Sequence, residues 1–336
     1  MKVAINGFGR IGRSVFRILN KQNKIKVVAI NDLADNDALT YLLKYDTVMG
    51  RLKDTVVVKD NVLKTSKHEI QMLSEPNPGK LPWGEIGVDV VVEATGIFRL
   101  KSQLQAHIDA GASRVILTVP SKDDIDYTVV IGVNEDRLTS EHKIVSNASC
   151  TTNCLAPMVK ILNDAFGIEY GVINTIHAYT NDQRLADVPH SDWRRSRAAA
   201  ENIIPTTTGA ARAVGKVLPE LDGKLDGIAM RVPVPDGSIV DLNTELKTNV
   251  TADDIRQAVQ DAAATARLAP ILEYENSPIV STDIIGNPHS SIFDAPFTTV
   301  IDKRFVKTLN WYDNEWGYSN RVVDLIKIFS ERMLHD

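Results

Sequence analysis

A glycine-rich segment near the start of the chain constrains the fold more than any other feature. Residues 2–5 (Lys-Val-Ala-Ile) form a short apolar run typical of a strand, and Gly7, Gly9 and Gly12 follow it with the spacing G-x-G-x-x-G. A helical pattern of apolar residues continues through residues 15–19. Glycines at this spacing let the backbone approach a pyrophosphate, whose charge then lies at the start of the helix. The segment therefore predicts a dinucleotide site.

The next strand supports this prediction and bears on the choice of cofactor. Residues 26–30 form a second apolar run, and Asp32 lies twenty residues after Gly12, where a carboxylate can bond the ribose 2′-hydroxyl. A carboxylate repels the 2′-phosphate of NADP, and Leu33 adds no positive charge to offset it. We therefore expect NAD as the cofactor.

Further apolar runs predict a parallel sheet covered on both faces. Residues 88–92, 114–117 and 127–131 are rich in Val and Ile and alternate with helical stretches, as in a Rossmann-type domain. The ends of these strands are expected to line the cofactor crevice. They carry three candidate cofactor contacts: Thr95, Gly96 and Thr118.

Cys150 is the first candidate for covalent chemistry. It lies among small polar residues, directly before an apolar pattern of helical period that continues to Phe166. Ser149 or Asn147 is a plausible N-cap, which places the thiol in the first turn, where the helix dipole favours a thiolate. The alternative is a small buried hydrophobic residue. Cys154 opens the apolar run, and we interpret it as structural.

His177 is a candidate base. It ends an apolar strand, residues 171–176, that follows directly on the cysteine helix, so it can lie near Cys150. A thiol and an imidazole within hydrogen-bond reach form an activated nucleophile with a proton acceptor. A lone histidine after a strand is otherwise a structural residue.

Arginines and threonines gather in the polar stretch that follows, as an anion site requires. For any single arginine the alternative is solvated surface charge or an oligomer contact. The stretch and its flanks contain these residues: Arg184, Arg194, Arg195, Arg197, residues 206–209 and Arg231.

The bulk composition is that of a two-domain cytoplasmic protein. The 336 residues include 43% hydrophobic and 24% charged residues, and the two cysteines fit a reducing compartment. We expect no membrane span, because no apolar run is long enough, and no metal site, because no ligand set accompanies the cysteines. The net charge of −5 argues against nucleic acid as a primary partner.

The second half is expected to be an α+β domain with a mainly antiparallel sheet. Residues 228–232 and 238–246 read as strands, the latter with clean alternation, and an amphipathic helix from about residue 320 to 333 closes the chain. We expect a Rossmann domain over residues 1–149, completed by a C-terminal helix within 315–336, and a catalytic domain over 150–314.

Five motifs in one order resemble the phosphorylating, NAD-dependent glyceraldehyde-3-phosphate dehydrogenase family along the whole chain. They are Ala-Ile-Asn-Gly-Phe-Gly-Arg-Ile-Gly-Arg from Ala4, residues 146–154, residues 176–183, residues 205–211 and residues 311–318. The resemblance implies that Cys150 attacks the aldehyde of glyceraldehyde 3-phosphate and that His177 acts as the base. Hydride would pass to the nicotinamide, and inorganic phosphate would cleave the resulting thioester to an acyl phosphate.

The resemblance also implies binding roles. The attacking phosphate would be held by Ser149, Thr151, Thr208 and Gly209. Thr180 and Arg231 would hold the substrate phosphate, and Arg197 matches an anion-site arginine, although Arg194 and Arg195 crowd the same place. The implied cofactor contacts are Gly7, Gly9, Arg10, Ile11, Gly12, Asp32, Asn314 and Tyr318. The family is a homotetramer, and the polar stretch matches its inter-subunit loop.

Two rival interpretations compete with this one. The related erythrose-4-phosphate dehydrogenase shares the cysteine and histidine, but residues 178–181 and 206–209 match the triose-phosphate type. A non-catalytic NAD-binding protein of the same fold would have no need of Cys150, His177 and Arg231 together.

Overall fold

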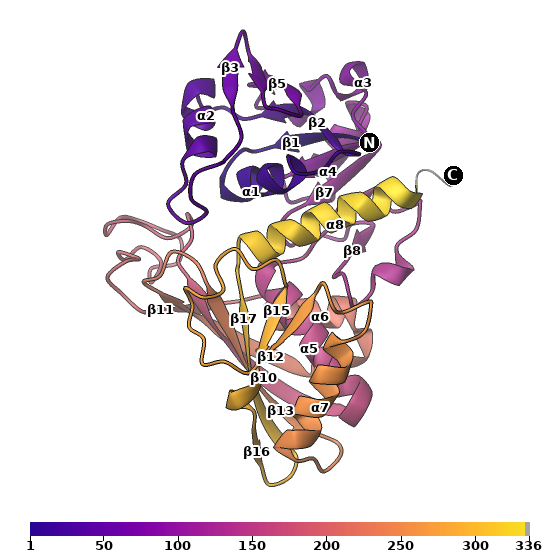
Figure 1. The fold of residues 1–336 in the computed structure, drawn as a ribbon, viewed down its shortest axis with the longest axis vertical. Coiled ribbons are helices and arrows are strands. Elements are labelled where there is room, and N and C mark those ends of the chain that lie inside the picture. The colour runs from indigo at the N-terminus through magenta and orange to yellow at the C-terminus, as the bar shows by residue number, and fades with distance from the viewer. Residues whose placement is uncertain (333–336) are drawn as a thin grey trace. The chain divides into compact units, whose positions relative to one another are not determined.

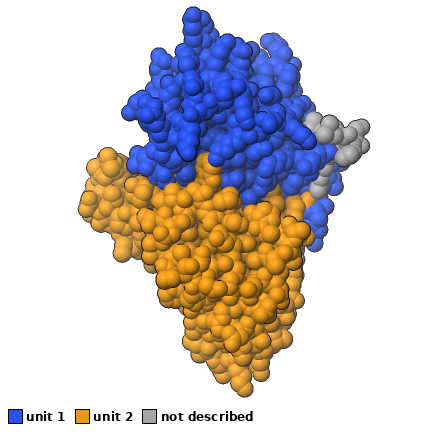
Figure 2. All heavy atoms as spheres, in the orientation of Figure 1, with its two compact units in different colours: residues 1–129, 136–148, 319–336 blue, residues 130–135, 149–318 orange. Residues whose placement is uncertain are grey.

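The computed structural model describes residues 1–332, which divide into two compact units (Figures 1 and 2). Unit 1 comprises residues 1–129, 136–148 and the C-terminal residues from 319, and unit 2 comprises residues 130–135 and 149–318. No helix within residues 1–332 has both the length and the apolar character needed to cross a membrane.

Unit 1 is built on a sheet whose central strands are parallel. The strand order is β3-β4-β5-β2-β1-β6-β7-β9-β8. Strands β6 and β7 are buried along their whole length, as expected for a sheet covered on both faces. The strands are β1 (Lys2–Asn6), β2 (Lys26–Asn31), β3 (Val57–Lys59), β4 (Val62–Lys64), β5 (Glu69–Leu73), β6 (Val90–Glu93), β7 (Arg114–Leu117), β8 (Tyr127–Thr128) and β9 (Ile144–Ser146).

The helices of unit 1 follow the predicted alternation with strands. They are α1 (Arg10–Leu19), α2 (Asn36–Lys44), α3 (Trp83–Ile86), α4 (Lys101–Asp109) and, from residue 319 onward, α8 (Trp316–Arg332). Short 3₁₀ turns occupy Pro78–Lys80 and Glu135–Arg137, the latter with its last two residues in unit 1. The last helix begins four residues before the predicted start, and the end of its predicted range lies outside the described residues. The Rossmann-type parallel sheet is confirmed.

One strand prediction in unit 1 is wrong in extent. The apolar run 127–131 was expected to be one strand, but β8 ends at Thr128. The backbone N–H of Val130 donates to the Asn134 side chain at 2.8 Å, and that of Gly132 donates to Glu135 at 2.8 Å. These bonds satisfy the backbone locally, so the apolar residues turn into a loop that belongs to unit 2.

Unit 2 holds a second sheet, in the order β11-β12-β10-β13-β17-β15-β14, with β16 paired to β17. Most neighbours are antiparallel, which confirms the predicted character, while the β10–β12 and β14–β15 pairs are parallel. The strands are β10 (Ile168–Ala178), β11 (Ile204–Thr207), β12 (Leu225–Val232), β13 (Ser238–Leu246), β14 (Leu272–Glu275), β15 (Ser291–Asp294), β16 (Thr299–Ile301) and β17 (Phe305–Tyr312).

Helices cover one face of this second sheet (Figure 1). Several apolar side chains are exposed on its other face. The covering helices are α5 (Cys150–Phe166), α6 (Ala210–Val217) and α7 (Ala252–Ala263), and 3₁₀ turns occupy Pro219–Leu221 and Ala295–Phe297. Residues 173, 175 and 177 of β10 are buried on the helical side. Tyr170 and Val172 of the same strand alternate to the opposite face and are 62% and 59% exposed.

A buried polar network ties together the loops at the carboxyl ends of β1 and β6. The carboxylate of Glu93, fully buried, accepts hydrogen bonds from Asn6 Nδ2 at 2.5 Å, from the backbone N and hydroxyl of Thr95, and from His107 Nε2 at 3.1 Å. Trp83 Nε1 donates to His107 Nδ1 at 3.0 Å. Because an indole only donates, Nδ1 is the acceptor and the ring proton lies on Nε2, facing Glu93.

Glu93→Gln is expected to destabilise the protein by about 3 kcal/mol, because an amide N–H₂ would face two other donors in a fully buried site. Trp83 prevents His107 from changing tautomer to relieve that conflict. The double variant Trp83→Phe/Glu93→Gln should therefore lose less free energy of unfolding than the two single variants lose together, by about 1 kcal/mol. Urea denaturation of the four proteins measures this coupling, and strictly additive changes would contradict the network.

Candidate active site

Cys150 opens helix α5, as the sequence predicts. Ser149 is the N-cap, and its hydroxyl accepts a hydrogen bond from the backbone N–H of Thr152 at 3.0 Å. Cys150 is partly exposed, whereas Cys154 is fully buried, with its sulfur 3.6 Å from the carbonyl oxygen of Asn310. The more exposed of the two residues is the one at the helix start, so the chemical candidate and the structural cysteine are separated by one helical turn.

Tyr312 fixes the start of α5 against the sheet. Its buried hydroxyl lies 2.9 Å from the Thr151 hydroxyl on α5 and 2.8 Å from the Thr175 hydroxyl on β10. Its ring meets the His177 imidazole edge to face, with centroids 5.8 Å apart. One aromatic side chain thus positions both the cysteine helix and the histidine strand. Nothing local in the sequence distinguishes Tyr312 from a core tyrosine, so its role could not be predicted.

The thiol and the imidazole are within reach of one another. Cys150 Sγ lies 3.5 Å from His177 Nε2. His177 lies on the helical face of β10, while Cys150 begins the helix that packs on that face. Burial and the positive charge of Arg231 lower the pKa of His177 to about 3, so the imidazole is neutral at neutral pH. A neutral imidazole beside a thiol has the form of a general base.

The expectation that the helix start favours a thiolate is wrong for this arrangement. Burial raises the pKa of the Cys150 thiol above its ordinary value, although the charge of Arg231 and hydrogen bonds at the start of α5 act in the opposite direction. Desolvation of the sulfur therefore outweighs the helix terminus. A thiol with a raised pKa forms its thiolate only with the help of a base, and the imidazole of His177 is within reach.

Arg231 comes next to His177 because β10 and β12 run parallel in that register. The two residues are paired across the ladder, and Arg231 Nη1 lies 2.6 Å from His177 Nδ1 and 2.9 Å from the carbonyl oxygen of Ala178. Arg231 Nε is buried and has no hydrogen-bond partner within residues 1–332. A partly exposed arginine whose buried Nε is an unused donor suits an anionic ligand.

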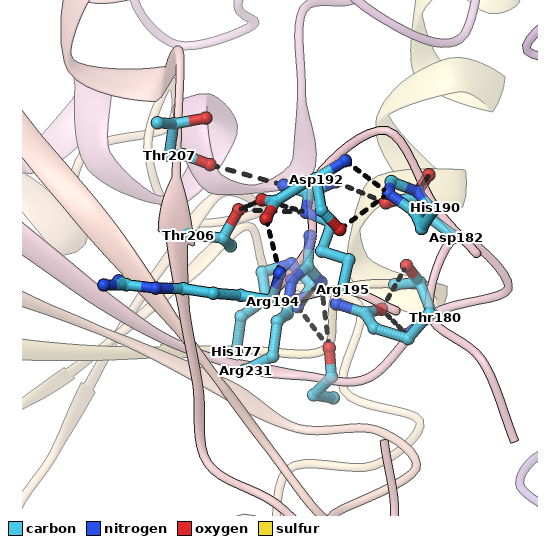
Figure 3. Close-up of polar contacts among 12 residues, drawn as sticks. His177, Thr180, Asp182, His190, Asp192, Arg194, Arg195, Thr206, Thr207 and Arg231 are labelled. Carbon is cyan, nitrogen blue, oxygen red and sulfur yellow. Dashed lines mark hydrogen bonds and ion pairs between the residues drawn. The ribbon is translucent and has the colours of Figure 1, made fainter. Parts of the chain in front are cut away.

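A polar group formed by the 179–207 stretch contains Arg195 (Figure 3). Its Nε donates to the Thr206 hydroxyl at 2.9 Å, and its Nη1 forms an ion pair with Asp182. Thr206 in turn donates to Asp192 at 2.7 Å. Thr180 lies in the same view, with its hydroxyl bonded to Gln183 at 3.1 Å.

Arg197 lies apart from this group. Its Nε contacts the Asp187 carboxylate at 2.9 Å, and its side chain is 60% exposed. The structure therefore brings Arg195, and not Arg197, toward Thr206 and Arg231. Spacing could not separate the three arginines, because they occupy neighbouring positions in an irregular loop.

The other predicted phosphate contacts lie in unit 2 with Cys150. Thr151 is buried beside it at the start of α5. Gly209 is the N-cap of α6, and a side chain added there would meet nothing within 4 Å. The Thr208 hydroxyl accepts from the Ala210 N–H at 3.2 Å. Open backbone at a helix start, next to a hydroxyl, can receive a phosphate oxygen.

Asn314 is held by Ser238, a residue that the sequence analysis did not single out. The Ser238 hydroxyl donates to Asn314 Oδ1 at 2.7 Å and accepts from the Ala178 N–H at 3.0 Å. This serine links the strand end that carries His177 to Asn314 by direct hydrogen bonds. Tyr318, the other predicted contact from this region, is buried in unit 2.

The glycine loop of unit 1 fits a dinucleotide. Gly7 has φ +92°, and a Cβ there would lie 2.6 Å from the Thr95 backbone N, while a Cβ at Gly12 would lie 2.1 Å from the Gly7 carbonyl oxygen. Added Cβ atoms at Gly9 and Gly96 would meet nothing, and no side chain caps α1. The close contacts require glycine, and the open ones leave room for phosphate at the helix start.

The remaining predicted cofactor residues surround this loop in unit 1. Asp32 accepts hydrogen bonds from the Phe8 N–H at 2.7 Å and the Ala34 N–H at 3.0 Å, which fixes its carboxylate at the end of β2. Arg10 forms a bidentate pair with Asp46, at 2.7 and 3.1 Å. The Thr118 hydroxyl donates to the Glu93 carbonyl oxygen at 3.0 Å, and Ile11 is partly exposed in the first turn of α1.

Asp236, buried near Ser238 in sequence and space, makes stability depend on pH. Burial and the nearby carboxylates of Asp313 and Glu315 raise the pKa of Asp236 to about 9. The folded state thus binds a proton that the unfolded state releases above about pH 4, so stability falls as pH rises from about 4 toward 9.

Asp236→Asn is expected to reduce this dependence, because burial also raises the pKa of Asp313, which can still titrate. The amide cannot ionise. The free energy of unfolding of the variant, relative to that of the unmutated protein, should therefore be higher at about pH 8.5 than at about pH 5, by about 2 kcal/mol or more. Urea denaturation at both values measures the gain. Asp226→Asn, at an exposed position of β12, is the control and should parallel the unmutated protein. An equal difference at both pH values would show that Asp236 is not the group responsible.

A parallel-sheet domain with a dinucleotide loop, joined to a domain with a cysteine–histidine pair, fits the class of NAD-dependent dehydrogenases. Two family models match this chain: "Glyceraldehyde 3-phosphate dehydrogenase, NAD binding domain" at residues 1–101, and "Glyceraldehyde 3-phosphate dehydrogenase, C-terminal domain" at residues 149–314. The chain belongs to the glyceraldehyde-3-phosphate dehydrogenase family, and its cofactor is NAD.

Individual relatives agree along nearly the whole length. Glyceraldehyde-3-phosphate dehydrogenase of Streptomyces coelicolor is 55% identical over 97% of both chains. Glyceraldehyde-3-phosphate dehydrogenase 2 of Bacillus subtilis is 54% identical over 100% of this chain and 98% of its own. Glyceraldehyde-3-phosphate dehydrogenase of Mycobacterium tuberculosis is 51% identical over 99% of both chains.

Proposed function

We propose that the protein oxidises D-glyceraldehyde 3-phosphate to 1,3-bisphosphoglycerate, with reduction of NAD and uptake of inorganic phosphate, as a step of glycolysis and gluconeogenesis. The observation that carries the proposal is the 3.5 Å approach of Cys150 Sγ to His177 Nε2, at a helix start beside Arg231, in a chain of this family. We assign residues 150–314 to catalysis, and residues 1–149 with the C-terminal helix to NAD.

The first step is attack of Cys150 on the aldehyde carbon. The C–S bond forms as His177 Nε2 takes the thiol proton, and that proton then passes to the former carbonyl oxygen, which gives a hemithioacetal on the protein. The raised pKa of the thiol makes this base necessary. The N–H groups at the start of α5 face the developing negative charge on the substrate oxygen.

The second step oxidises that carbon. NAD, when bound, supplies the acceptor for a hydride. His177 removes the hydroxyl proton as the carbon loses its hydride, so the imidazole becomes a cation and the carbon becomes a thioester of Cys150. Inorganic phosphate then attacks the thioester carbon, the C–S bond breaks, and the departing sulfur recovers a proton from His177.

We assign the phosphate contacts by position in unit 2. Ser149, Thr151, Thr208 and Gly209 are proposed to hold the attacking phosphate, while Thr180 and Arg231 hold the phosphate of the substrate. The family resemblance proposes Arg197 for an anion site. Arg195 is the stronger candidate of the two, because it contacts Thr206 whereas Arg197 pairs with Asp187.

NAD is proposed to contact the glycine loop and its surroundings. Asp32 supports NAD over NADP, because its carboxylate is held in place by two backbone N–H groups at the end of β2. The proposed contacts are Gly7, Gly9, Arg10, Ile11, Gly12, Asp32, Thr95, Gly96, Thr118, Asn314 and Tyr318.

We propose a homotetramer in the cytoplasm. Support for oligomerisation comes from the face of the second sheet opposite its helices, where Tyr170, Val172, Ile228, Ile301 and Phe305 share one face by register and are all exposed. Large apolar side chains exposed together on one sheet face are typical of a surface covered by another subunit. The cytoplasmic assignment rests on the family and on two free cysteines.

Absorbance of NADH with purified protein tests the proposal. Rapid NADH formation from glyceraldehyde 3-phosphate and NAD, dependent on inorganic phosphate, is expected. Erythrose 4-phosphate and NADP, run in parallel, should give much slower rates. Activity confined to erythrose 4-phosphate would transfer the assignment to the related enzyme, and tight NAD binding without any turnover would favour a non-catalytic protein.

A further inference from the structure

Three buried polar side chains end three neighbouring strands of unit 1. Asn31 ends β2, Asn6 ends β1 and Glu93 ends β6, and these strands lie side by side in that order. The three residues are 4%, 1% and 0% exposed. Each is followed closely in the chain by residues proposed to contact NAD. In the same order, these contacts are Asp32, Gly7, and Thr95 with Gly96.

The hydrogen bonds among these side chains have one direction, which the backbone fixes. The N–H of Glu75, in the loop after β5, donates to Asn31 Oδ1 at 2.8 Å, and Asn31 Nδ2 donates to the Glu75 carbonyl oxygen at 2.9 Å. Because backbone groups cannot exchange these roles, the Asn31 amide has one orientation. Its Nδ2 also donates to Asn6 Oδ1 at 2.7 Å, so Asn6 Nδ2 is the donor to Glu93, at 2.5 Å.

Glu93 receives only donors at the end of this chain of bonds. Besides the asparagine amide, the N–H and the hydroxyl of Thr95 donate to it, while the same hydroxyl accepts from the Ile97 N–H at 3.1 Å. His107, whose ring proton Trp83 places on Nε2, is the fourth donor. Four donors on two oxygens match the acceptor capacity of an ionised carboxylate, which an amide cannot replace.

We propose that this chain of bonds, the Asn31–Asn6–Glu93 relay, positions the loops that bind NAD, and that its three members are positioning residues that set NAD affinity without touching the cofactor. Glu93 holds Thr95 by two bonds. Gly7 packs so closely there that an added Cβ would lie 2.6 Å from the Thr95 nitrogen, so a shift of Thr95 changes the glycine loop as well. The inference rests on the proposed NAD contacts and not on the proposed reaction.

A neutral amide at position 93 would disrupt the relay in either orientation. If its oxygen keeps the bonds to Thr95, its N–H₂ faces the donors of Asn6 and His107. Asn6 cannot turn to accept from it, because Asn6 Oδ1 is needed by Asn31, whose own amide the backbone holds. If the new amide turns round, its N–H₂ faces both donors of Thr95. The Thr95 loop then has to move, and NAD has to order it on binding, which lowers affinity.

Calorimetric titration of the full-length protein with NAD tests the proposal. Glu93→Gln should bind NAD about tenfold more weakly than the unmutated protein. The double variant Asn6→Asp/Glu93→Gln reverses one bond of the relay, because a carboxylate at position 6 accepts from the amide at position 93 and still accepts from Asn31. It should regain about threefold or more of the lost affinity.

Leu63→Ala separates positioning from loss of stability. Leu63 is fully buried in β4 and makes no bond in the relay, so its truncation should lower the urea midpoint while NAD affinity stays within about twofold. Unchanged NAD affinity in Glu93→Gln, or an equal loss in Leu63→Ala, overturns the proposal.

Thr95→Val gives a second test should Glu93→Gln fail to fold, because it removes only the hydroxyl bond to Glu93 at the partly exposed end of the relay. It should bind NAD about threefold more weakly, and Thr95→Ser should recover most of that loss. Equal affinities of the valine and serine variants would contradict the relay. These titrations need no turnover, so their outcome is independent of the NADH measurement that tests the proposed function.

Discussion

Replacing Cys150 with serine is expected to lower the rate of NADH formation by ~10⁴-fold or more while leaving NAD affinity unchanged. A serine hydroxyl has a far higher pKa than a thiol, and the neutral imidazole of His177 cannot remove its proton to the same extent. Cys150 is not among the proposed NAD contacts, and serine preserves its size, so cofactor binding should survive. Steady-state rates and calorimetric titration with NAD measure the two effects separately.

Cys154→Ser is the matched control for that change. Cys154 lies one turn along the same helix, and its sulfur contacts Ser291 and the carbonyl oxygen of Asn310, partners that a hydroxyl can also bond. The control should keep most of its activity. Loss of activity in Cys154→Ser alone, with Cys150→Ser active, would reverse the assignment of the two cysteines.

His177→Asn is expected to lower kcat by about 10²–10⁴-fold, with a much smaller change in KM. An amide can occupy the space of the ring but cannot accept a proton from the thiol, so only the chemical steps are affected. The rate at which iodoacetamide alkylates Cys150 near neutral pH should fall as well, because less thiolate forms.

His289→Asn controls for loss of a histidine as such. His289 is a partly exposed residue of unit 2 that contacts Asn287 and the carbonyl oxygen of Ala269, so kcat should stay close to that of the unmutated protein. An equal fall in both histidine variants, or none in His177→Asn, would contradict the role of His177 as the base.

The local features of the site could be predicted from the sequence because they depend on neighbours in the chain. The glycine spacing identified the loop whose Gly7 and Gly12 permit no side chain. The small polar residues before α5 predicted the cap, and Ser149 occupies it. The resemblance to a family then supplied roles that no periodicity contains.

Long-range contacts could not be predicted in this way. The approach of Arg231 to His177 requires β10 and β12 to pair in parallel with one particular register, although 54 positions separate the residues. The thiolate prediction failed because desolvation of Cys150 depends on the residues packed around it, which composition does not reveal. The prediction of a strand over residues 129–131 also failed for a reason that the apolar pattern does not show. The Asn134 side chain accepts the hydrogen bond of the Val130 N–H, which a strand would have given to its neighbour in the sheet.

The most direct test of the account is to find the covalent intermediate on Cys150. Protein mixed with glyceraldehyde 3-phosphate and NAD, without inorganic phosphate, should make about one NADH per site and stop. Acid quenching and peptide mass spectrometry should then find the acyl group on the peptide that contains Cys150, and phosphate added before the quench should remove it. A burst of NADH with that peptide unmodified, or with the acyl group on another residue, would contradict the thioester mechanism.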